Sequence, residues 1–380
     1  MDEAAEVLDM WVEAPIPSAS EQTRLELLKA GLLTAGLRLD DPVRQALEAR
    51  SGGSLTMHEY ATTGGLTLDL GSSVLVNAPV DEWFCDGTEF ELLLEGETLV
   101  IRDPAGDYHR VESHIPLPGY LSETDSEGRA IVDTCFSHAD RVRLSPINGC
   151  AYKCDYCNLP AERYTRHDQA QLIEALMVAI DDHALPPRHA LVSGGSPGSR
   201  HVDWFVETIL GVVAASPVPV DVMMSAIPGR PEVVDSLVDG GVAGFSINME
   251  LFGDEVSELH IKGKHRHARP GYDAFVTRAV ERLGRTGAVR SLIIAGLEEQ
   301  DETLRGIAHI AALGADPVIS PFRPAERTSL HDQRPPGAAE MLELLDAARV
   351  VAADHGVHLG PRCIPCHHNT LTFPWDVRDG

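Results

Sequence analysis

The sequence predicts an α/β fold: a partial (β/α)6, TIM-like barrel of parallel strands, with a small α+β module before it and a cysteine-containing tail after it. From about residue 140, short apolar runs alternate with helical patterns, and six such strand–helix units follow one another. Repeated βα units favour a parallel sheet covered by helices, and six are too few for a closed eight-stranded barrel. We therefore expect an N-terminal module at 1–139, the barrel at 140–356 and the tail at 357–380.

The N-terminal module is predicted to combine helices with hairpins. Leu25, Leu28 and Leu32 recur at helical spacing within the first 50 residues, and Pro42 stands early in a second short helix. Short alternating or apolar runs separated by Gly and Asp turns then indicate strands. These runs are 66–70, 73–77, 90–94 and 98–102. The polar segment 119–129 indicates an exposed linker.

The barrel elements follow in strict alternation. The expected strands are 141–146, 190–193, 218–225, 244–248, 289–295 and 317–321. The expected helices are 170–183, 202–214, 231–238, 272–283, 302–313 and 336–355. In such folds the chemistry collects at the C-terminal ends of the strands.

Charge and composition exclude several classes of partner. The 380 residues carry a formal net charge of −27, so a nucleic-acid phosphate backbone would be repelled and we expect no nucleic-acid partner. No apolar run approaches the ~20 residues of a membrane span, and the acidic N-terminus lacks signal-peptide features. We expect a cytoplasmic protein without a membrane partner, in which seven cysteines serve as metal ligands or buried thiols rather than disulfides.

Three cysteines, Cys150, Cys154 and Cys157, follow the first barrel strand with the spacing C-x3-C-x2-C. Three thiolates this close can hold three irons of a [4Fe-4S] cluster and leave the fourth iron open to a cofactor. Structural zinc sites usually close with four ligands, often from two C-x2-C pairs, which this stretch lacks. A zinc knuckle and a plain electron-transfer cluster are the alternatives.

The spacing, with Tyr156 just before the last cysteine, resembles the signature of the radical S-adenosylmethionine (radical SAM) enzymes. The resemblance implies a [4Fe-4S] cluster whose open iron binds SAM, and a 5′-deoxyadenosyl radical that takes hydrogen from a small-molecule substrate. It also implies an electron donor such as flavodoxin or ferredoxin.

Further marks of this resemblance follow in order over residues 140–356. Gly194, Gly195 and Ser196 resemble the glycine-rich segment that receives the SAM amino group, with Ser196 where an acidic residue is usual. Asn248 and Glu250 resemble the Asn-x-Asp/Glu segment of the biotin synthase and lipoyl synthase branch, which implies contacts with SAM and its ribose hydroxyls.

Three single residues complete the resemblance. Arg269 stands in an Arg-Pro-Gly-Tyr segment like that of lipoyl synthases and would pair with the SAM carboxylate. Ile294 stands before a Gly-Leu-x-Glu turn and would pack near the adenine. Arg323, after the sixth strand, would reach SAM or the substrate.

The tail carries Cys363 and Cys366 in a second C-x2-C pair, followed by His367 and His368. This spacing suits metal ligands. We expect the pair to hold part of an auxiliary iron–sulfur cluster over the barrel mouth. Either Cys85 or Cys135, or one of the two histidines, would supply a further ligand. A zinc clasp and non-ligating thiols are the alternatives.

The resemblance favours a radical SAM enzyme of the biotin/lipoyl-synthase-like branch. Lipoyl synthase itself is excluded, because only Cys85 and Cys135 precede the main motif and its second cysteine-rich motif is missing. No Rossmann-like cobalamin domain or basic RNA-binding module is evident. Bond cleavage, rearrangement, dehydrogenation or group transfer remains, with sulfur insertion at an auxiliary cluster as the alternative. The rivals of another class are a non-catalytic iron–sulfur carrier or sensor and a zinc-stabilised binding protein.

Overall fold

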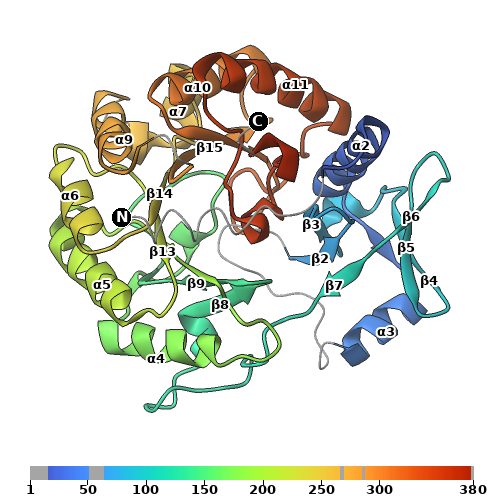
Figure 1. Ribbon diagram of the computed structural model, residues 1–380, viewed down its shortest axis with the longest axis horizontal. Helices are drawn as coiled ribbons and strands as arrows, with labels where there is room; N and C mark the ends of the chain where they lie inside the picture. The colour runs from blue at the N-terminus through green and yellow to red at the C-terminus, as the bar shows by residue number, and fades with distance from the viewer. Residues whose placement is uncertain (1–15, 51–63, 266–268, 285–286, 378–380) are drawn as a thin grey trace.

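The computed structural model describes residues 16–50, 64–265, 269–284 and 287–377. A partial barrel occupies one side of the molecule and the N-terminal module the other, with the C-terminal tail between them (Figure 1). The expectations for residues 1–15 and 51–63 lie outside the described residues.

The barrel is built on a seven-stranded sheet with the order β16-β15-β14-β13-β12-β9-β8. Its strands are β8 (Cys135–His138), β9 (Arg141–Leu144), β12 (His189–Val192), β13 (Val220–Met224), β14 (Gly244–Ile247), β15 (Val289–Ala295) and β16 (Asp316–Pro321). All neighbours pair in parallel except β8 and β9. The six expected strands are confirmed. The sheet differs from the prediction in its seventh strand, β8, which begins before the expected boundary at residue 140.

Helices follow the parallel strands and form an outer ring around the sheet (Figure 1). They are α4 (Gln169–Ile180), α5 (Val202–Ala215), α6 (Glu232–Asp239), α7 (Asp254–His260), α8 (Lys262–His265), α9 (Arg269–Leu283), α10 (Gln300–Ala312) and α11 (Ala338–His355). The six expected barrel helices are confirmed to within a few residues. The short helices α7 and α8 are additional, and they lie between β14 and α9.

Side chains alternate along the strands between the helices and the barrel interior, as the two-residue period of a strand requires. In β9, Val142 and Leu144 are fully buried in the hydrophobic core, whereas Arg141 and Arg143 line an interior cavity. In β15, Ile293 joins the core, whereas its neighbours on either side line the same cavity. The interior of the barrel is therefore more polar than the layer between sheet and helices.

The N-terminal module has helices α2 (Ala19–Ala35) and α3 (Asp41–Arg50) and two small sheets. One sheet has the order β1-β4-β5-β6 and the other β3-β2-β7. The strands are β1 (Arg38–Leu39), β2 (Gly65–Asp69), β3 (Leu75–Pro79), β4 (Glu91–Glu95), β5 (Thr98–Arg102), β6 (Tyr108–Arg110) and β7 (Ser113–Ile115). The four expected strands and the two expected helices are found.

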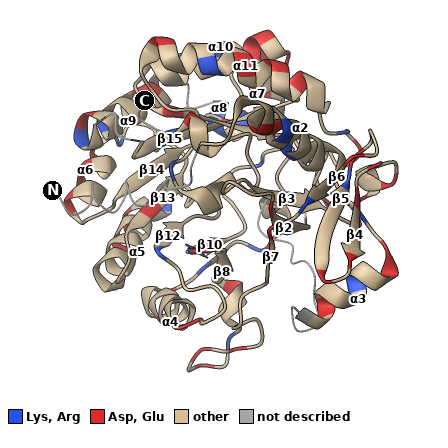
Figure 2. Cartoon of the chain, turned by 45° about the vertical axis from the view of Figure 1, so that its right-hand side comes forward, with Lys and Arg blue, Asp and Glu red and all other residues tan. Residues whose placement is uncertain are grey.

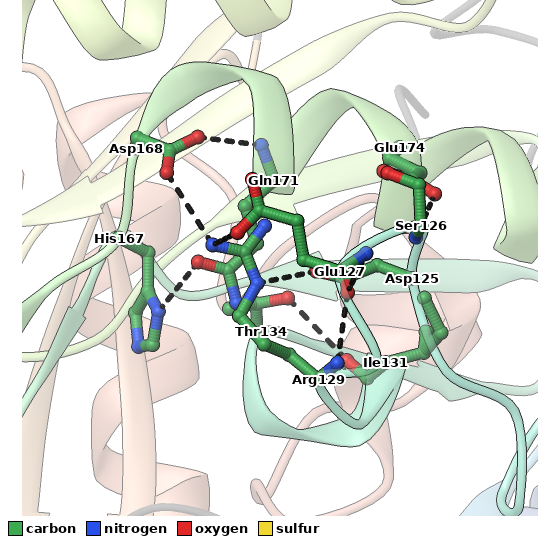
Figure 3. A network of polar contacts seen from close by, with 10 residues as sticks. All are labelled: Asp125, Ser126, Glu127, Arg129, Ile131, Thr134, His167, Asp168, Gln171 and Glu174. Carbon is green, nitrogen blue, oxygen red and sulfur yellow. Dashed lines mark hydrogen bonds and ion pairs between the residues drawn. The ribbon is translucent and has the colours of Figure 1, made fainter.

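The segment expected to be an exposed linker is instead tied to the barrel by polar contacts (Figure 3). The Asp125 carboxylate accepts hydrogen bonds from the backbone of Glu127 and Arg129 and from the Arg129 side chain. Glu174, on α4, accepts from the backbone nitrogen and the hydroxyl of Ser126 at 2.6 and 2.8 Å. The Asp125 carboxylate therefore stabilises the turn itself, and the Glu174 carboxylate attaches the turn to α4.

The tail fills the gap between the two edge strands of the barrel sheet. On one side, the Leu371 nitrogen donates to the Ile319 carbonyl of β16 at 2.8 Å. On the other side, the His368 ring stacks on His138 of β8, with ring centroids 4.7 Å apart. The His368 carbonyl also accepts from the Asn77 nitrogen of β3 at 2.6 Å. The tail thus joins both barrel edges to the N-terminal module.

Acidic residues colour much of the outer helices α10 and α11 (Figure 2). They contribute to the net charge of −27 that the chain carries. Among the helices of the described ranges, none combines the length and apolarity that crossing a membrane requires.

Candidate cofactor cavity

The loop that carries Cys150, Cys154 and Cys157 follows β9 at the C-terminal edge of the sheet. A two-stranded ribbon brackets it, formed by β10 (Ile147–Asn148) and β11 (Thr165–Arg166). All three cysteines are partly exposed and line one interior cavity. The loop is therefore where the strand–helix alternation predicts chemistry to collect.

Backbone N–H groups point at one of the sulfurs. The Cys150 Sγ accepts from the Tyr152 nitrogen at 3.4 Å and from the Ser196 nitrogen at 3.2 Å. Hydrogen bonds to the ligand sulfurs are one way in which proteins stabilise and tune iron–sulfur clusters. The three thiols and these donors fit a [4Fe-4S] cluster held by three cysteines.

The thiols beside Cys150 are protonated in the absence of iron. Burial raises the pKa of Cys154 to about 12 and that of Cys157 to about 11. A metal must displace both protons to bind, because only a thiolate is a good ligand. Binding of iron at this loop is therefore coupled to proton release.

The glycine-rich segment after β12 packs directly on the cysteine loop. A Cβ added to Gly195 would lie 1.7 Å from the Gly149 carbonyl oxygen, so only glycine fits there. Gly194 and Ser196, on either side, line the cavity. The structure thus places the glycine-rich segment beside the cysteine loop. Gly195 allows the two backbones to contact each other, and its neighbours face the cavity.

Four further predicted residues, Tyr156, Asn248, Glu250 and Ile294, line the same cavity. Glu250 has a left-handed backbone, with φ of 73°, and exchanges backbone hydrogen bonds of 2.8 Å with Leu292 and Ile294 of β15. This strained conformation is fixed by the neighbouring strand. It aims the carboxylate at the Lys264 Nζ, 2.5 Å from its Oε1.

The charge of Lys264 is secured by that contact. Burial lowers the pKa of Lys264, but the charge and hydrogen bond of Glu250, together with the nearby Cys154 and Cys150, raise it above its usual value, so the ammonium group is retained. Lys264 also lines the cavity. Sequence reasoning missed this partner, although it stands in α8 only fourteen residues after Glu250.

The two predicted arginines have partners within the chain. Arg269 lines an adjoining cavity rather than the one with the cysteines, and its guanidinium lies 3.9 Å from the Phe252 ring centroid. Arg323 lines the cysteine cavity, where its Nη1 donates to the Asn77 carbonyl oxygen at 3.0 Å. Burial lowers the pKa of Arg323 to about 10.

The tail cysteines do not lie over the barrel mouth, and this expectation was wrong. Cys363 Sγ is 3.5 Å from His189 Nδ1, and Cys366 Sγ is 3.6 Å from Arg141 Nη1. His189 and Arg141 are the first residues of their strands. The tail cysteines therefore lie at the opposite end of the strands from Cys150, roughly 10 Å along a four-residue strand.

The third residue near the tail cysteines is also different from those expected. His189, Cys363 and Cys366 offer ligand atoms that all lie within 4.8 Å of one another. His367 and His368 instead contact the carbonyls of Pro361 and Pro365. Cys85 lies beside Pro79, and Cys135 beside Tyr120.

The thiols of the tail pair titrate unequally. Burial raises the pKa of Cys363 well above its usual value, whereas a hydrogen bond from Cys363 lowers that of Cys366. Arg141 adds to the lowering.

Three arginines that the sequence reasoning missed form the cavity floor. Arg141 and Arg143 come from β9 and Arg290 from β15, and all three side chains are buried and line the cavity. Arg290 Nη1 pairs with Asp221 Oδ2 at 2.8 Å. Although burial raises the pKa of Asp221, the charges of Arg290 and His189 lower it overall. The signal in the sequence was a charged residue at alternate positions of an otherwise apolar strand.

A family model matches the part of the chain that holds the cysteine loop. The model of the radical SAM superfamily matches residues 144–311, which hold the cysteine loop and the four parallel strands β12, β13, β14 and β15. The matched part of the chain is therefore similar to the radical SAM superfamily. No curated protein matches it.

Several solved structures resemble this one at low identity. A radical SAM methyltransferase from Sphaerobacter thermophilus is 15% identical, with a TM-score of 0.45 over 71% of this chain and 76% of that chain. Methylornithine synthase (PylB) is 15% identical, with a TM-score of 0.42 over 65% and 81% of the two chains.

The FeFe-hydrogenase maturase HydG from Carboxydothermus hydrogenoformans is 14% identical, with a TM-score of 0.47 over 60% of this chain. This chain spans little more than half of HydG, 57% of its length. No substrate or reaction follows from these likenesses.

The similarity to the radical SAM superfamily implies a [4Fe-4S] cluster and SAM as cofactors. The cavity fits them by its own chemistry, with three thiols at one edge, backbone donors at Cys150 and the Glu250 carboxylate opposite.

Proposed function

We propose that this protein is an enzyme that cleaves SAM reductively at a cluster on Cys150, Cys154 and Cys157 and transforms a small molecule in the same cavity. The observation that carries the proposal is that these cysteines share one cavity with Asn248 and Glu250. When bound, the cluster and SAM supply a 5′-deoxyadenosyl radical, which takes a hydrogen atom from the substrate. A one-electron reductant such as flavodoxin or ferredoxin is required.

In this proposal, the residues of the chain bind and orient the cluster and SAM and shield them from solvent. The backbone nitrogens of Tyr152 and Ser196 hold the sulfur of Cys150. Glu250, fixed by β15 and by Lys264, offers its carboxylate to hydroxyl groups of SAM. Asn248 and Glu250 also support placing the protein near the biotin and lipoyl synthase branch.

The cavity floor supports an anionic substrate. Arg141, Arg143 and Arg290 bring three positive charges to the cavity, and Asp221 pairs with one of them. Buried guanidinium groups suit carboxylates and phosphates, which they bind through two parallel hydrogen bonds. We infer that the substrate carries such a group, held at the floor while the reacting carbon lies toward the cysteine loop.

The experiment is anaerobic reconstitution followed by measurement of iron, sulfide and 5′-deoxyadenosine formed from SAM. The variant carries Cys150→Ala, Cys154→Ala and Cys157→Ala together, and Cys85→Ala is the matched control. We expect the triple variant to lose about four irons and all SAM cleavage, and the control to lose neither. A reducible cluster that never cleaves SAM, with or without candidate substrates, would favour an electron carrier or sensor.

The anionic substrate is tested with a panel of small carboxylates and phosphate esters. Compounds that bind at the floor should stimulate 5′-deoxyadenosine formation in the wild type and not in Arg143→Gln. Arg110→Gln, at an exposed position outside the cavity, is the control and should keep the response. Equal stimulation by neutral analogues would contradict the inference.

A further inference from the structure

A second group of ligand atoms lies at the end of the barrel opposite the cysteine loop. His189, Cys363 and Cys366 are 1%, 4% and 8% exposed, and their ligand atoms all lie within 4.8 Å of one another. The cysteines come from the tail and the histidine from β12. Two thiols and an imidazole therefore lie together although they come from segments more than 170 residues apart. These groups are typical ligands of a transition-metal ion.

The spacing of these atoms matches a single ion. With usual bond lengths to sulfur and nitrogen, two ligands of a tetrahedral zinc ion lie about 3.5 Å apart. Cys363 Sγ and His189 Nδ1 are 3.5 Å apart. In a [4Fe-4S] cluster each cysteine binds a different iron, which separates the ligand sulfurs further than a shared ion does. The geometry therefore fits ligands that share one ion better than the ligands of a [4Fe-4S] cluster.

The imidazole is already oriented for this role. His189 Nε2 lies 3.3 Å from Asp221 Oδ2, and Arg290 holds the same carboxylate oxygen at 2.8 Å. Histidine ligands of metals usually donate their other ring N–H to a carboxylate, which fixes the tautomer and the ring orientation. Here this arrangement turns Nδ1 toward the sulfurs.

The tail holds its two cysteines in a compact turn. The Cys366 nitrogen donates to the Cys363 carbonyl at 3.0 Å, and the short 3-10 helix Ile364–His367 follows. Arg141 Nη1, 3.6 Å from Cys366 Sγ, places a positive charge beside a thiolate. Two thiolates neutralise a divalent ion, so Arg141 would act as a hydrogen-bond donor to a ligand sulfur.

We propose that His189 Nδ1, Cys363 Sγ and Cys366 Sγ bind one divalent ion, zinc by donor preference, whose fourth position faces the cavity. Thiolate and imidazole donors suit zinc, and a site with three protein ligands keeps one position for water or substrate. Cys366 lines the cavity, which sets the ion at the floor beside the arginines. The proposal is independent of SAM cleavage.

The first test is metal analysis in the variant that lacks all three loop cysteines. That background removes iron bound at the catalytic loop, so the remaining metal belongs elsewhere. We expect about one zinc per chain, with no stoichiometric iron or sulfide. Adding Cys363→Ser or Cys366→Ser should abolish it, whereas Cys135→Ser, at a buried cysteine beside Tyr120, should leave it unchanged.

The second test uses Co²⁺ as an optical probe in the metal-free form of the same background. We expect a thiolate-to-cobalt charge-transfer band with tetrahedral ligand-field absorption. Asp221→Asn keeps all three ligands and should weaken the affinity about 10- to 100-fold. This variant keeps the test decisive if the ligand variants fail to fold.

Four results would overturn the proposal. Iron and sulfide in the triple-alanine background would assign the tail to an auxiliary cluster. Absence of both zinc and a cobalt spectrum would leave the cysteines as plain thiols. Metal loss from Cys135→Ser equal to that from Cys363→Ser, or an unchanged affinity in Asp221→Asn, would place the ion elsewhere.

Discussion

Gly195 connects the two loops that build the cluster end of the cavity. Its backbone approaches Gly149 so closely that a Cβ would lie 1.7 Å from the Gly149 oxygen. The next residue, Ser196, donates its backbone N–H to Cys150 Sγ. The absence of a side chain at Gly195 therefore decides whether this donor reaches the sulfur.

Gly195→Ala should push the glycine-rich segment away from the cysteine loop. We expect reconstituted protein to lose most of its iron at the loop, because the contact is backbone against backbone and neither side can yield cheaply. The control is Gly87→Ala, where an added Cβ meets nothing within 4 Å. Iron and sulfide analysis checks the prediction, and an unchanged cluster content in Gly195→Ala would contradict it.

At this scale the sequence predicted the residues that belong to local motifs. Three cysteines at fixed spacing, and the residues that directly follow strand ends, lie around one cavity as expected. It did not predict Arg141, Arg143 or His189, because charged residues in buried strands run against the usual burial preference. The partners of Arg141 and His189 in the tail are more than 170 residues away, which no local pattern encodes.

Among the elements, the parallel strands and their helices were predicted well because each carries its own period. Strand β8 was missed because its hairpin with β9 lacks a turn signal. His138 pairs with Arg141 across the two residues Ala139 and Asp140, and Ala139 has a φ of 47°. Such tight turns usually carry glycine or asparagine. An alanine there conceals the turn from sequence reasoning.

The turn at Asp125 lends itself to a test of how firmly it is attached to the barrel. Asp125→Ala removes the acceptor for Glu127, Arg129 and the Arg129 side chain. We expect trypsin to cut after Arg129 several-fold faster, because the backbone there is then free to open locally. Glu123→Ala, in the same segment but outside this set of bonds, serves as the control. Cleavage at equal rates in both variants would show that the turn is held by other contacts.

Across the whole molecule, the tail bonds with the module as well as with the barrel. Lys29 of α2 is fully buried, and its Nζ donates to the Thr372 carbonyl at 2.7 Å. At the same junction, the part-buried Arg349 of α11 pairs with Glu26 and Asp376. The contacts of Lys29 with Thr372 and of Arg349 with Glu26 join residues more than 300 positions apart, so the assembly of module, barrel and tail was beyond sequence reasoning.

Lys29 makes stability at this junction depend on pH. Burial lowers the pKa of Lys29 to about 7, whereas an unfolded lysine titrates near about 10.4. Between those values the unfolded chain binds more protons, so stability rises with pH. Lys29→Met removes this pH-dependent contribution to the free energy of unfolding, which changes by an amount on the order of 2 kcal/mol between pH 7 and pH 9.5.

Urea unfolding of the wild type and Lys29→Met under reducing conditions at the two pH values measures the difference. The stability of the wild type relative to the variant should rise with pH. Lys262→Met, at an exposed lysine, is the control and should follow the wild type at both values. Parallel pH profiles for the wild type and Lys29→Met would contradict the prediction.

The position of the tail between the two sheet edges also imposes an order on biogenesis. A nascent chain that ends at residue 355 already contains the three loop cysteines and all six parallel strands. It lacks Cys366, His368, Asn369 and Thr370, which complete the cavity wall. The wall of the cavity can therefore be complete only after residue 370 has left the ribosome, so the iron-binding loop is synthesised before the cavity around it can close.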